Sequence, residues 1–153
     1  MNVVAEDDIV RLTESIWLST VNLLPTATVL NSVEPSAEPA TMLDGIVHIT
    51  GDHSATVAVR VPYALASKLA KAMFALDGTD PTPEDLQDAL GEIANITGGN
   101  IKALLEGEHA LTLPVVIEGS SYRVRVPGGQ VVNRVEFQCD GMPFVVSIIA
   151  RKS

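Results

Sequence analysis

The chain has few cysteines, few aromatic residues and few basic residues, and each shortage excludes something. Cys139 is the only cysteine, which excludes an intramolecular disulfide and favours a reducing compartment. Aromatic residues make up 4% of the sequence, so a core must consist mainly of Val, Ile, Leu and Ala. No apolar run approaches the roughly 18 residues that a membrane-spanning helix requires. The N-terminus lacks the basic and apolar regions of a signal peptide, so we expect a cytoplasmic protein.

The shortage of basic residues gives the chain a strongly acidic balance. It has 10 Lys and Arg against 19 Asp and Glu, a formal net charge of −9. Nucleic acids and anionic membranes are bound by basic surfaces, so neither is expected as a partner. With 46% hydrophobic residues, the composition is that of a globular protein. No linker or low-complexity segment divides it, and we expect a single domain over residues 1–153.

Hydrophobic periodicity and turn residues predict the order of helices and strands. Helices are expected over residues 6–23, 63–76 and 83–107. Strands are expected from 28–30 onward, over 42–50, 55–61, 111–117, 131–139 and 144–150, with a short extended piece at 122–126. The turns at 51–54 and at Asp140-Gly141 predict hairpins. This order predicts an α+β fold with two pseudo-repeated units of helix plus antiparallel strands, whose long helices pack on a mostly antiparallel sheet.

Residues 88–102 are the most informative stretch, because as a helix they sort onto two faces. One face collects the apolar and core-type side chains, which are Leu86, Leu90, Ile93, Thr97, Ile101 and Leu104. The other face collects Asp88, Glu92 and Asn95 with three glycines, which are Gly91, Gly98 and Gly99. Glycine costs about 1 kcal/mol relative to alanine inside a helix. Either this face is solvated and its glycines are incidental, or it is built for close approach by another molecule.

Glu92 and Asn95 project on the same side of that helix, three residues apart. A carboxylate is a partner for a lysine, and a carboxamide donates and accepts hydrogen bonds at once, so it can hold a water molecule in a defined direction. This combination suits hydrolysis by positioning. Phosphoryl transfer is of that kind, with an amide orienting the attacking water.

These residues, with their neighbours, resemble a known family. The pattern Asp88-x-x-x-Glu92-x-x-Asn95, followed by Gly99-Asn100-Ile101-Lys102 and the Leu-x-Leu-Pro stretch that ends at Pro114, is similar to the CheX branch of the CheC/CheX chemotaxis phosphatases. The resemblance implies an enzyme, an aspartyl-phosphate protein phosphatase. Its substrate would be the phosphorylated aspartate of a CheY-type response regulator.

The resemblance also implies roles for individual residues. Glu92 would contact the lysine of the receiver domain, and Asn95 would orient the water that attacks the aspartyl phosphate. Further contacts with the partner would come from Asp88, Gly91, Gly98 and Lys102. The Mg²⁺ of the reaction would belong to the response regulator, so no cofactor or metal of this chain's own is expected.

Two comparisons with the family's pattern bear on the number and form of the sites. CheC-like members repeat the motif on the first helix, but here Trp17 stands where an Asn is needed. One active face is therefore expected, and Trp17 is expected in the core or an interface. Pro114 lies closer to Asn95 than the family's downstream proline does. The alternative to catalysis is a non-catalytic receiver-binding or dimeric interaction domain that keeps the fold, and a homodimer is compatible with either function.

The remaining candidate residues have simpler interpretations. His48, Asp52 and His53 cluster in sequence, but no fourth ligand is evident and we expect no metal site. His109 has no recognisable partner and is interpreted as a surface residue. Cys139 is interpreted as a packed apolar residue, not a nucleophile. The arginines near the C-terminus, Arg123, Arg125 and Arg134, are interpreted as a solvated strand face.

Overall fold

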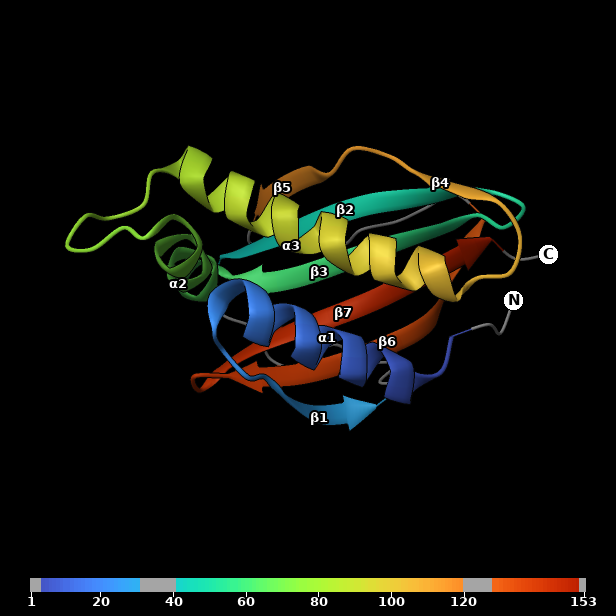
Figure 1. The fold of residues 1–153 in the computed structure, drawn as a ribbon, viewed down its shortest axis with the longest axis horizontal. Coiled ribbons are helices and arrows are strands. Elements are labelled where there is room, and N and C mark those ends of the chain that lie inside the picture. The colour runs from blue at the N-terminus through green and yellow to red at the C-terminus, as the bar shows by residue number, and fades with distance from the viewer. Residues whose placement is uncertain (1–3, 31–40, 120–127, 152–153) are drawn as a thin grey trace.

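The computed structural model describes residues 4–30, 41–119 and 128–151, in which three helices lie on one face of an antiparallel sheet (Figure 1). The helices are α1 (Glu6–Val21), α2 (Tyr63–Phe74) and α3 (Pro83–Leu104). The strands are β1 (Thr26–Leu30), β2 (Met42–Gly51), β3 (Ala55–Pro62), β4 (His109–Leu111), β5 (Val115–Gly119), β6 (Gly129–Cys139) and β7 (Met142–Arg151). The predicted α+β class is confirmed. No helix in the described ranges is long and apolar enough to cross a membrane.

The order of the strands confirms the two pseudo-repeated units. The sheet runs β1-β6-β7-β3-β2-β4, and β5 also pairs with β2. One unit is α1 with β1 to β3, and the other is α3 with β5 to β7. The last strands of the two units, β3 and β7, pair at the centre. The first strand of each unit pairs with the second strand of the other, β1 with β6 and β5 with β2. The two units therefore interlock, and α1 and α3 lie side by side on the same face of the sheet (Figure 1).

The helix that carries the motif begins with a capping box. The Thr82 hydroxyl accepts a hydrogen bond from the Asp85 amide at 3.1 Å, and the Asp85 carboxylate accepts one from the Thr82 amide at 2.9 Å. Pro83 occupies the first turn, where its missing N–H has no cost. The prediction that Leu104 lies on the core-facing side is wrong. The helix ends there and Leu104 is 43% exposed, whereas the extended Leu105 turns inward and is buried.

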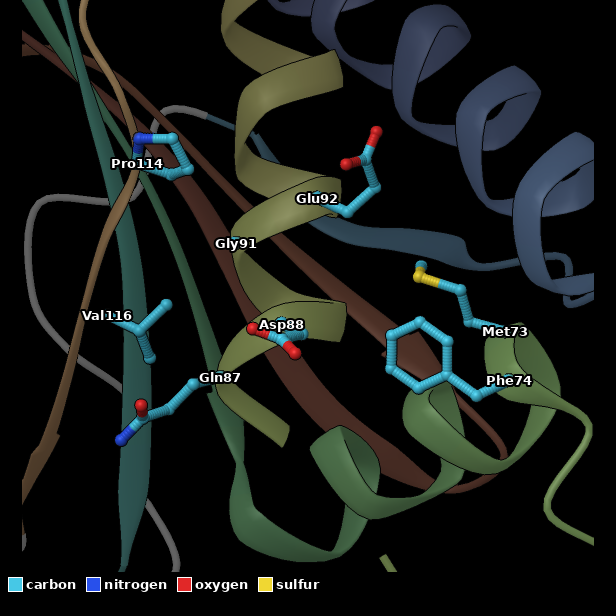
Figure 2. A pocket seen from close by; sticks show the side chains of 8 residues that line it. All are labelled: Met73, Phe74, Gln87, Asp88, Gly91, Glu92, Pro114 and Val116. Carbon is cyan, nitrogen blue, oxygen red and sulfur yellow. The ribbon is translucent and has the colours of Figure 1, made fainter. Parts of the chain in front are cut away.

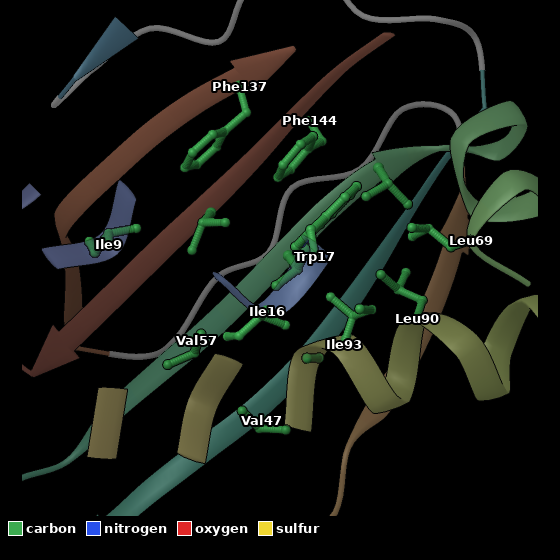
Figure 3. Packing of buried hydrophobic residues seen from close by; sticks show 14 of the residues in the cluster. Ile9, Ile16, Trp17, Val47, Val57, Leu69, Leu90, Ile93, Phe137 and Phe144 are labelled. Atoms are coloured by element: carbon green, nitrogen blue, oxygen red, sulfur yellow. The ribbon is translucent and has the colours of Figure 1, made fainter. Parts of the chain in front are cut away.

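The core lies between the three helices and the facing side of the sheet (Figure 3). Its aromatic residues form one stack, because the Trp17 ring lies 4.1 Å from that of Phe144, which in turn lies 4.8 Å from that of Phe137. Trp17, expected in the core or an interface, is fully buried in the core. Half of the chain's Phe, Tyr and Trp residues thus meet at the contact between α1 and the centre of the sheet.

The helix α3 comes unusually close to β2 because Gly45 has no side chain. A Cβ atom there would lie 2.9 Å from Ala94 Cβ and 3.0 Å from the carbonyl oxygen of Leu90. Such separations are too short for ordinary packing, so only glycine fits beneath the helix. This contact fixes the depth at which α3 sits on the sheet.

The predicted strand over 111–117 is in fact two strands. Both β4 and β5 pair with β2, and residues 112–114 interrupt them. The Thr112 amide donates to the His48 carbonyl at 2.9 Å, and its hydroxyl accepts from the His48 amide at 2.9 Å, so a side chain replaces one backbone partner. Pro114 has no N–H to continue the ladder. The predicted extended piece at 122–126 lies outside the described residues.

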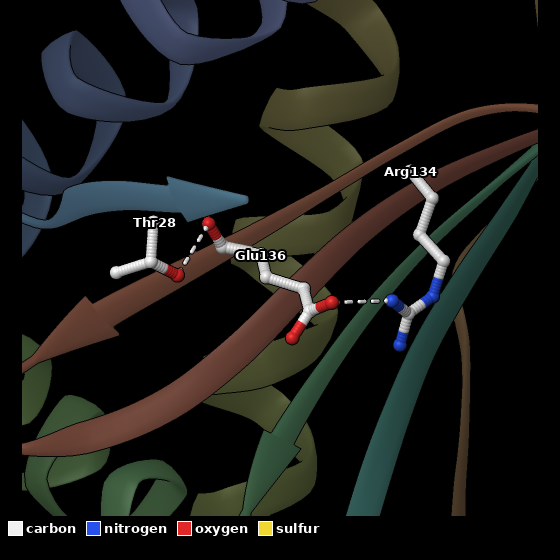
Figure 4. A network of polar contacts seen from close by, with 3 residues as sticks. All are labelled: Thr28, Arg134 and Glu136. Atoms are coloured by element: carbon white, nitrogen blue, oxygen red, sulfur yellow. Dashed lines mark hydrogen bonds and ion pairs between the residues drawn. The ribbon is translucent and has the colours of Figure 1, made fainter. Parts of the chain in front are cut away.

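The opposite face of the sheet carries buried ion pairs. Asp44 on β2 lies opposite Arg60 on β3 and pairs with it at 2.5 Å, and only 1% of the Asp44 side chain is exposed. On β6, Arg134 pairs with Glu136, whose carbonyl accepts a hydrogen bond from Thr28 on β1 (Figure 4). The Arg134 side chain is 12% exposed, so the interpretation of a solvated face is wrong for this residue. Arg123 and Arg125 lie outside the described residues.

Candidate functional site

The three polar residues of the motif lie on the outward face of α3, as the periodicity predicts. Asp88 and Glu92 are exposed, and Asn95 is half-buried one turn further along the helix. The inward face is buried, with Leu86, Leu90, Ile93, Thr97 and Ile101 each 1% exposed or less. Packing therefore holds the helix by one side and presents the motif on the other.

None of these three side chains has a partner among the described residues. The structure gives Asp88, Glu92 and Asn95 no ion pair and no side-chain hydrogen bond to any residue in the described ranges. Asn100 on the same helix differs, since its amide donates to the Ile96 carbonyl at 2.9 Å.

The charges on this face are arranged unevenly. Asp88 and Glu92 are four residues apart, where two acids repel each other by a few tenths of a kcal/mol. Lys102 lies on the same side of the helix but about 15 Å along the axis from Glu92, from the rise of about 1.5 Å per residue. The structure therefore brings the two acids together and leaves Lys102 at the far end of the face.

The three glycines do not share one environment, which corrects their predicted placement on the outer face. A Cβ atom at Gly98 would overlap Val47 Cγ2, so Gly98 faces the sheet and is closed to a partner. A Cβ atom at Gly91 would lie 3.7 Å from Pro114, and Gly91 is buried at this flank of the helix. Only Gly99 has open space around the Cβ position, with no atom within 4 Å. Of the three, Gly99 is the one that leaves the outward face open.

A pocket of about 500 Å³ lies over the first half of this face. Figure 2 shows Met73 and Phe74 of α2 on one side of α3, Pro114 and Val116 on the other, and Asp88 with Glu92 between these walls. Its lining is completed by Gln87 and Gly91. The sequence reasoning missed Met73, Phe74 and Val116, because they come from elements that meet α3 only in the folded chain. One of them, Phe74, has a side chain that is 39% exposed.

The histidines are engaged in local contacts. His48 Nδ1 lies 2.8 Å from the Thr56 hydroxyl, and the Asp52 carboxylate accepts the Glu108 amide at 2.8 Å. The interpretation of His109 as a surface residue without a partner is wrong: it is half-buried, its Nε2 accepts the His53 amide at 3.1 Å, and the two rings stack. The described ranges hold no group of three or more His, Cys, Asp or Glu side chains placed to bind a metal ion.

Cys139 is a buried residue at the end of β6, which confirms its interpretation as a packed side chain. Burial raises the pKa of its thiol, the nearby Asp140 carboxylate raises the pKa further, and Lys68 lowers it in part. The thiol therefore stays protonated near neutral pH, the form that is a poor nucleophile.

Comparison with known proteins points to one family. The sequence profile described as "Chemotaxis phosphatase CheX" matches residues 43–138, a range that includes all of α3. No curated protein sequence matches the chain. The family profile therefore carries the assignment at the level of sequence.

Solved structures share the fold at low sequence identity. The chemotaxis protein CheX from Desulfovibrio desulfuricans is 21% identical, with a TM-score of 0.75 over 93% of this chain and 95% of that one. CheX from Vibrio vulnificus is 16% identical, with a TM-score of 0.76 over 93% and 95%. CheX in a complex with CheY, BeF3 and Mg²⁺ from Borrelia burgdorferi is 16% identical, with a TM-score of 0.76 over 98% and 99%. Because the profile match spans more than half of its length, this chain belongs to the CheX family.

Proposed function

We propose that this protein is a cytoplasmic phosphatase that removes the phosphoryl group from the phospho-aspartate of a CheY-type receiver domain. The observation that carries the proposal is the pair Glu92 and Asn95, presented outward on a firmly packed helix with no partner among the described residues. The Borrelia burgdorferi relative in a complex with CheY supports a receiver as the partner. The name of the family supports hydrolysis as the reaction.

Asn95 has the chemistry to orient the attacking water. Its carbonyl oxygen accepts one hydrogen of the water, and its NH₂ group donates to the water or to a phosphoryl oxygen. The water oxygen then attacks phosphorus as the bond to the aspartate oxygen breaks, one water proton passes to a phosphoryl oxygen, and inorganic phosphate leaves the free aspartate carboxylate. Because this reaction depends on the position of the attacking water, an amide that orients the water accelerates it. Asn95 is half-buried, which reduces the number of directions open to its side chain.

Glu92 holds the receiver in place while Asn95 acts. Its exposed carboxylate lies nearly one turn before Asn95, so a lysine paired with Glu92 would place the phosphoryl group near the amide. The Mg²⁺ of the reaction is held by the receiver. The residues of this chain contribute binding and the orientation of water, and no metal of its own is required.

Assays on phosphorylated receivers test the proposal directly. Receivers encoded in the same genome are phosphorylated with acetyl phosphate, and loss of the phosphoryl group is followed with and without the protein. We expect at least one receiver to lose its phosphoryl group faster in the presence of the protein. If receivers bind the protein but none of them loses its phosphoryl group faster, the result would contradict the proposal and identify an interaction domain instead.

A further inference from the structure

We propose that Asp77, followed by Gly78, is a site of spontaneous modification, at which the peptide bond moves from the main-chain to the side-chain carboxyl group and leaves an isoaspartate. Asp-Gly sequences are prone to this reaction, because glycine has no side chain to obstruct its own amide. The fold leaves one such sequence in this chain free to react and protects the others. The chain contains three of them, which are Asp44-Gly45, Asp77-Gly78 and Asp140-Gly141.

The reaction requires the amide nitrogen to reach the carboxyl carbon of the residue before it. The Gly78 nitrogen attacks Cγ of Asp77, the amide proton and the carboxyl hydroxyl leave as water, and a five-membered succinimide ring forms. Water then opens the ring. Addition at Cγ restores aspartate, whereas addition at the main-chain carbonyl leaves glycine attached to the side chain. No other reactant takes part, so the backbone around the aspartate only has to be free to rotate.

The loop between α2 and α3 gives Asp77-Gly78 this freedom. Both residues are exposed, and the loop projects beyond the helices and the sheet (Figure 1). A Cβ atom at Gly78 would meet nothing within 4 Å, so neighbouring atoms leave room for the ring. The Asp77 amide donates to the Ala75 carbonyl at 3.1 Å. Within the described ranges, the structure gives the Asp77 carboxylate no partner and the Gly78 amide no acceptor.

Asp140-Gly141 is also exposed, but two contacts hold it. It forms the turn between β6 and β7, which is closed by the pairing of Cys139 with Met142. The Asp140 carboxylate pairs with Lys68 of α2. Ring closure here requires the carboxyl group to leave Lys68 and the turn to open, so the reaction waits for a local opening of the structure.

Asp44-Gly45 is closed to the reaction by burial. The Asp44 side chain is 1% exposed and pairs with Arg60. Gly45 lies in β2 between β3 and β5, directly beneath α3. Rotation of this backbone would break the centre of the sheet. Exposure, the ion pair and the hydrogen-bonded strands thus give the three sequences different environments, and none of them belongs to the proposed site.

The test follows isoaspartate in the folded and the unfolded protein. The full chain is incubated in water labelled with heavy oxygen, with and without guanidinium chloride, and its peptides are analysed by electron-transfer fragmentation, which distinguishes isoaspartate from aspartate. Asp77→Glu keeps the carboxylate but would need a larger, slower-forming ring. Lys68→Gln removes the ion pair from Asp140. Circular dichroism checks that both variants fold.

We expect the folded protein to form isoaspartate at Asp77 at least about tenfold faster than at Asp44 or Asp140, the protection given by an opening free energy near 1.4 kcal/mol. Asp77→Glu should lose this product, Lys68→Gln should react faster at Asp140, and in guanidinium chloride the three rates should converge. Equal rates at Asp77 and Asp140 in the folded protein would overturn the proposal. The same difference in guanidinium chloride would assign it to the sequence and overturn protection by the fold.

Discussion

Gly98 on α3 lies directly against Val47 on β2, so closely that a methyl group added to the glycine would overlap Val47 Cγ2 and come within 3.1 Å of Leu111 Cδ1. Gly45 lies two residues before Val47 on β2 and also contacts α3. The two contacts together determine how deeply the helix sits on the sheet. Asn95 lies just under one turn before Gly98, so the depth of the helix also determines how far its amide projects. Packing and the proposed site are thus coupled through Gly98, which faces the sheet.

Replacing Gly98 with alanine should destabilise the protein. The added methyl group forces Val47 or the helix to move, and overpacking of this kind costs about 1–3 kcal/mol. The better helix propensity of alanine offsets up to about 1 kcal/mol of this cost. Urea denaturation measures the change in the free energy of unfolding.

Gly99→Ala is the matched control for that substitution. It adds the same methyl group to the next residue of the same helix, where no atom lies within 4 Å. We expect it to stabilise the protein by about 0.5–1 kcal/mol. Equal effects of the two substitutions would contradict the proposed packing of α3.

Breaking the ion pair on the opposite face of the sheet should cost more. Asp44→Ala removes the carboxylate that pairs with Arg60, whose side chain is 17% exposed. Removing one member of a buried pair typically costs about 3–5 kcal/mol. Thermal denaturation measures the loss, and the double variant Asp44→Leu with Arg60→Met should recover a large part of it. A single variant as stable as the wild-type protein would show that the pair contributes little.

Glu92→Gln should weaken the proposed reaction without loss of stability. The substitution keeps the shape of an exposed side chain but removes the charge that pairs with the receiver's lysine. We expect kcat/KM to fall about tenfold, since charge-assisted hydrogen bonds contribute about 1.5–3 kcal/mol. Glu84→Gln is the control on the same helix, and steady-state dephosphorylation is the measurement. An equal effect at both positions would indicate a general loss of negative charge.

Cys139 should make the stability depend on pH at the alkaline end. Because folding raises the pKa of this thiol, the folded state disfavours the thiolate. Its contribution is fully present below the pKa of the unfolded chain and is lost as the pH rises through the pKa of the folded state. Urea denaturation from about pH 7 to about pH 10 should therefore show a smaller loss of stability in Cys139→Ala than in the wild-type protein. Parallel curves would contradict this role for the buried thiol.

Local patterns in the sequence predict much of this fold because they express local physics. The capping box at Thr82 and Asp85 begins α3 where expected, and Asp140-Gly141 forms the expected hairpin with positive φ at both residues. The split between β4 and β5 is harder to foresee. It depends on Thr112 serving both backbone groups of His48, a contact between residues 64 positions apart.

The site is predictable in its helix but not in its surroundings. Periodicity places Glu92 and Asn95 outward, since the apolar stripe fixes the inward direction. The periodicity does not decide the side of Gly98, because a glycine at the boundary of the stripe has no side chain to indicate it. The contact with Val47 places Gly98 toward the sheet. The pocket walls at Phe74 and Val116 depend on tertiary packing, and no spacing along the chain brings them together.

The most direct test of the proposed function is the rate at which a phosphorylated receiver loses its phosphoryl group in the presence of Asn95→Ala. Asn100→Ala is the matched control, since it removes an amide from the same helix that is engaged with the Ile96 carbonyl. We expect Asn95→Ala to reduce the acceleration about 100-fold, the scale of losing a positioned reactant, while it still binds the receiver and Asn100→Ala keeps the wild-type rate. Acceleration by Asn95→Ala equal to that of the wild-type protein would contradict the proposed role of this amide.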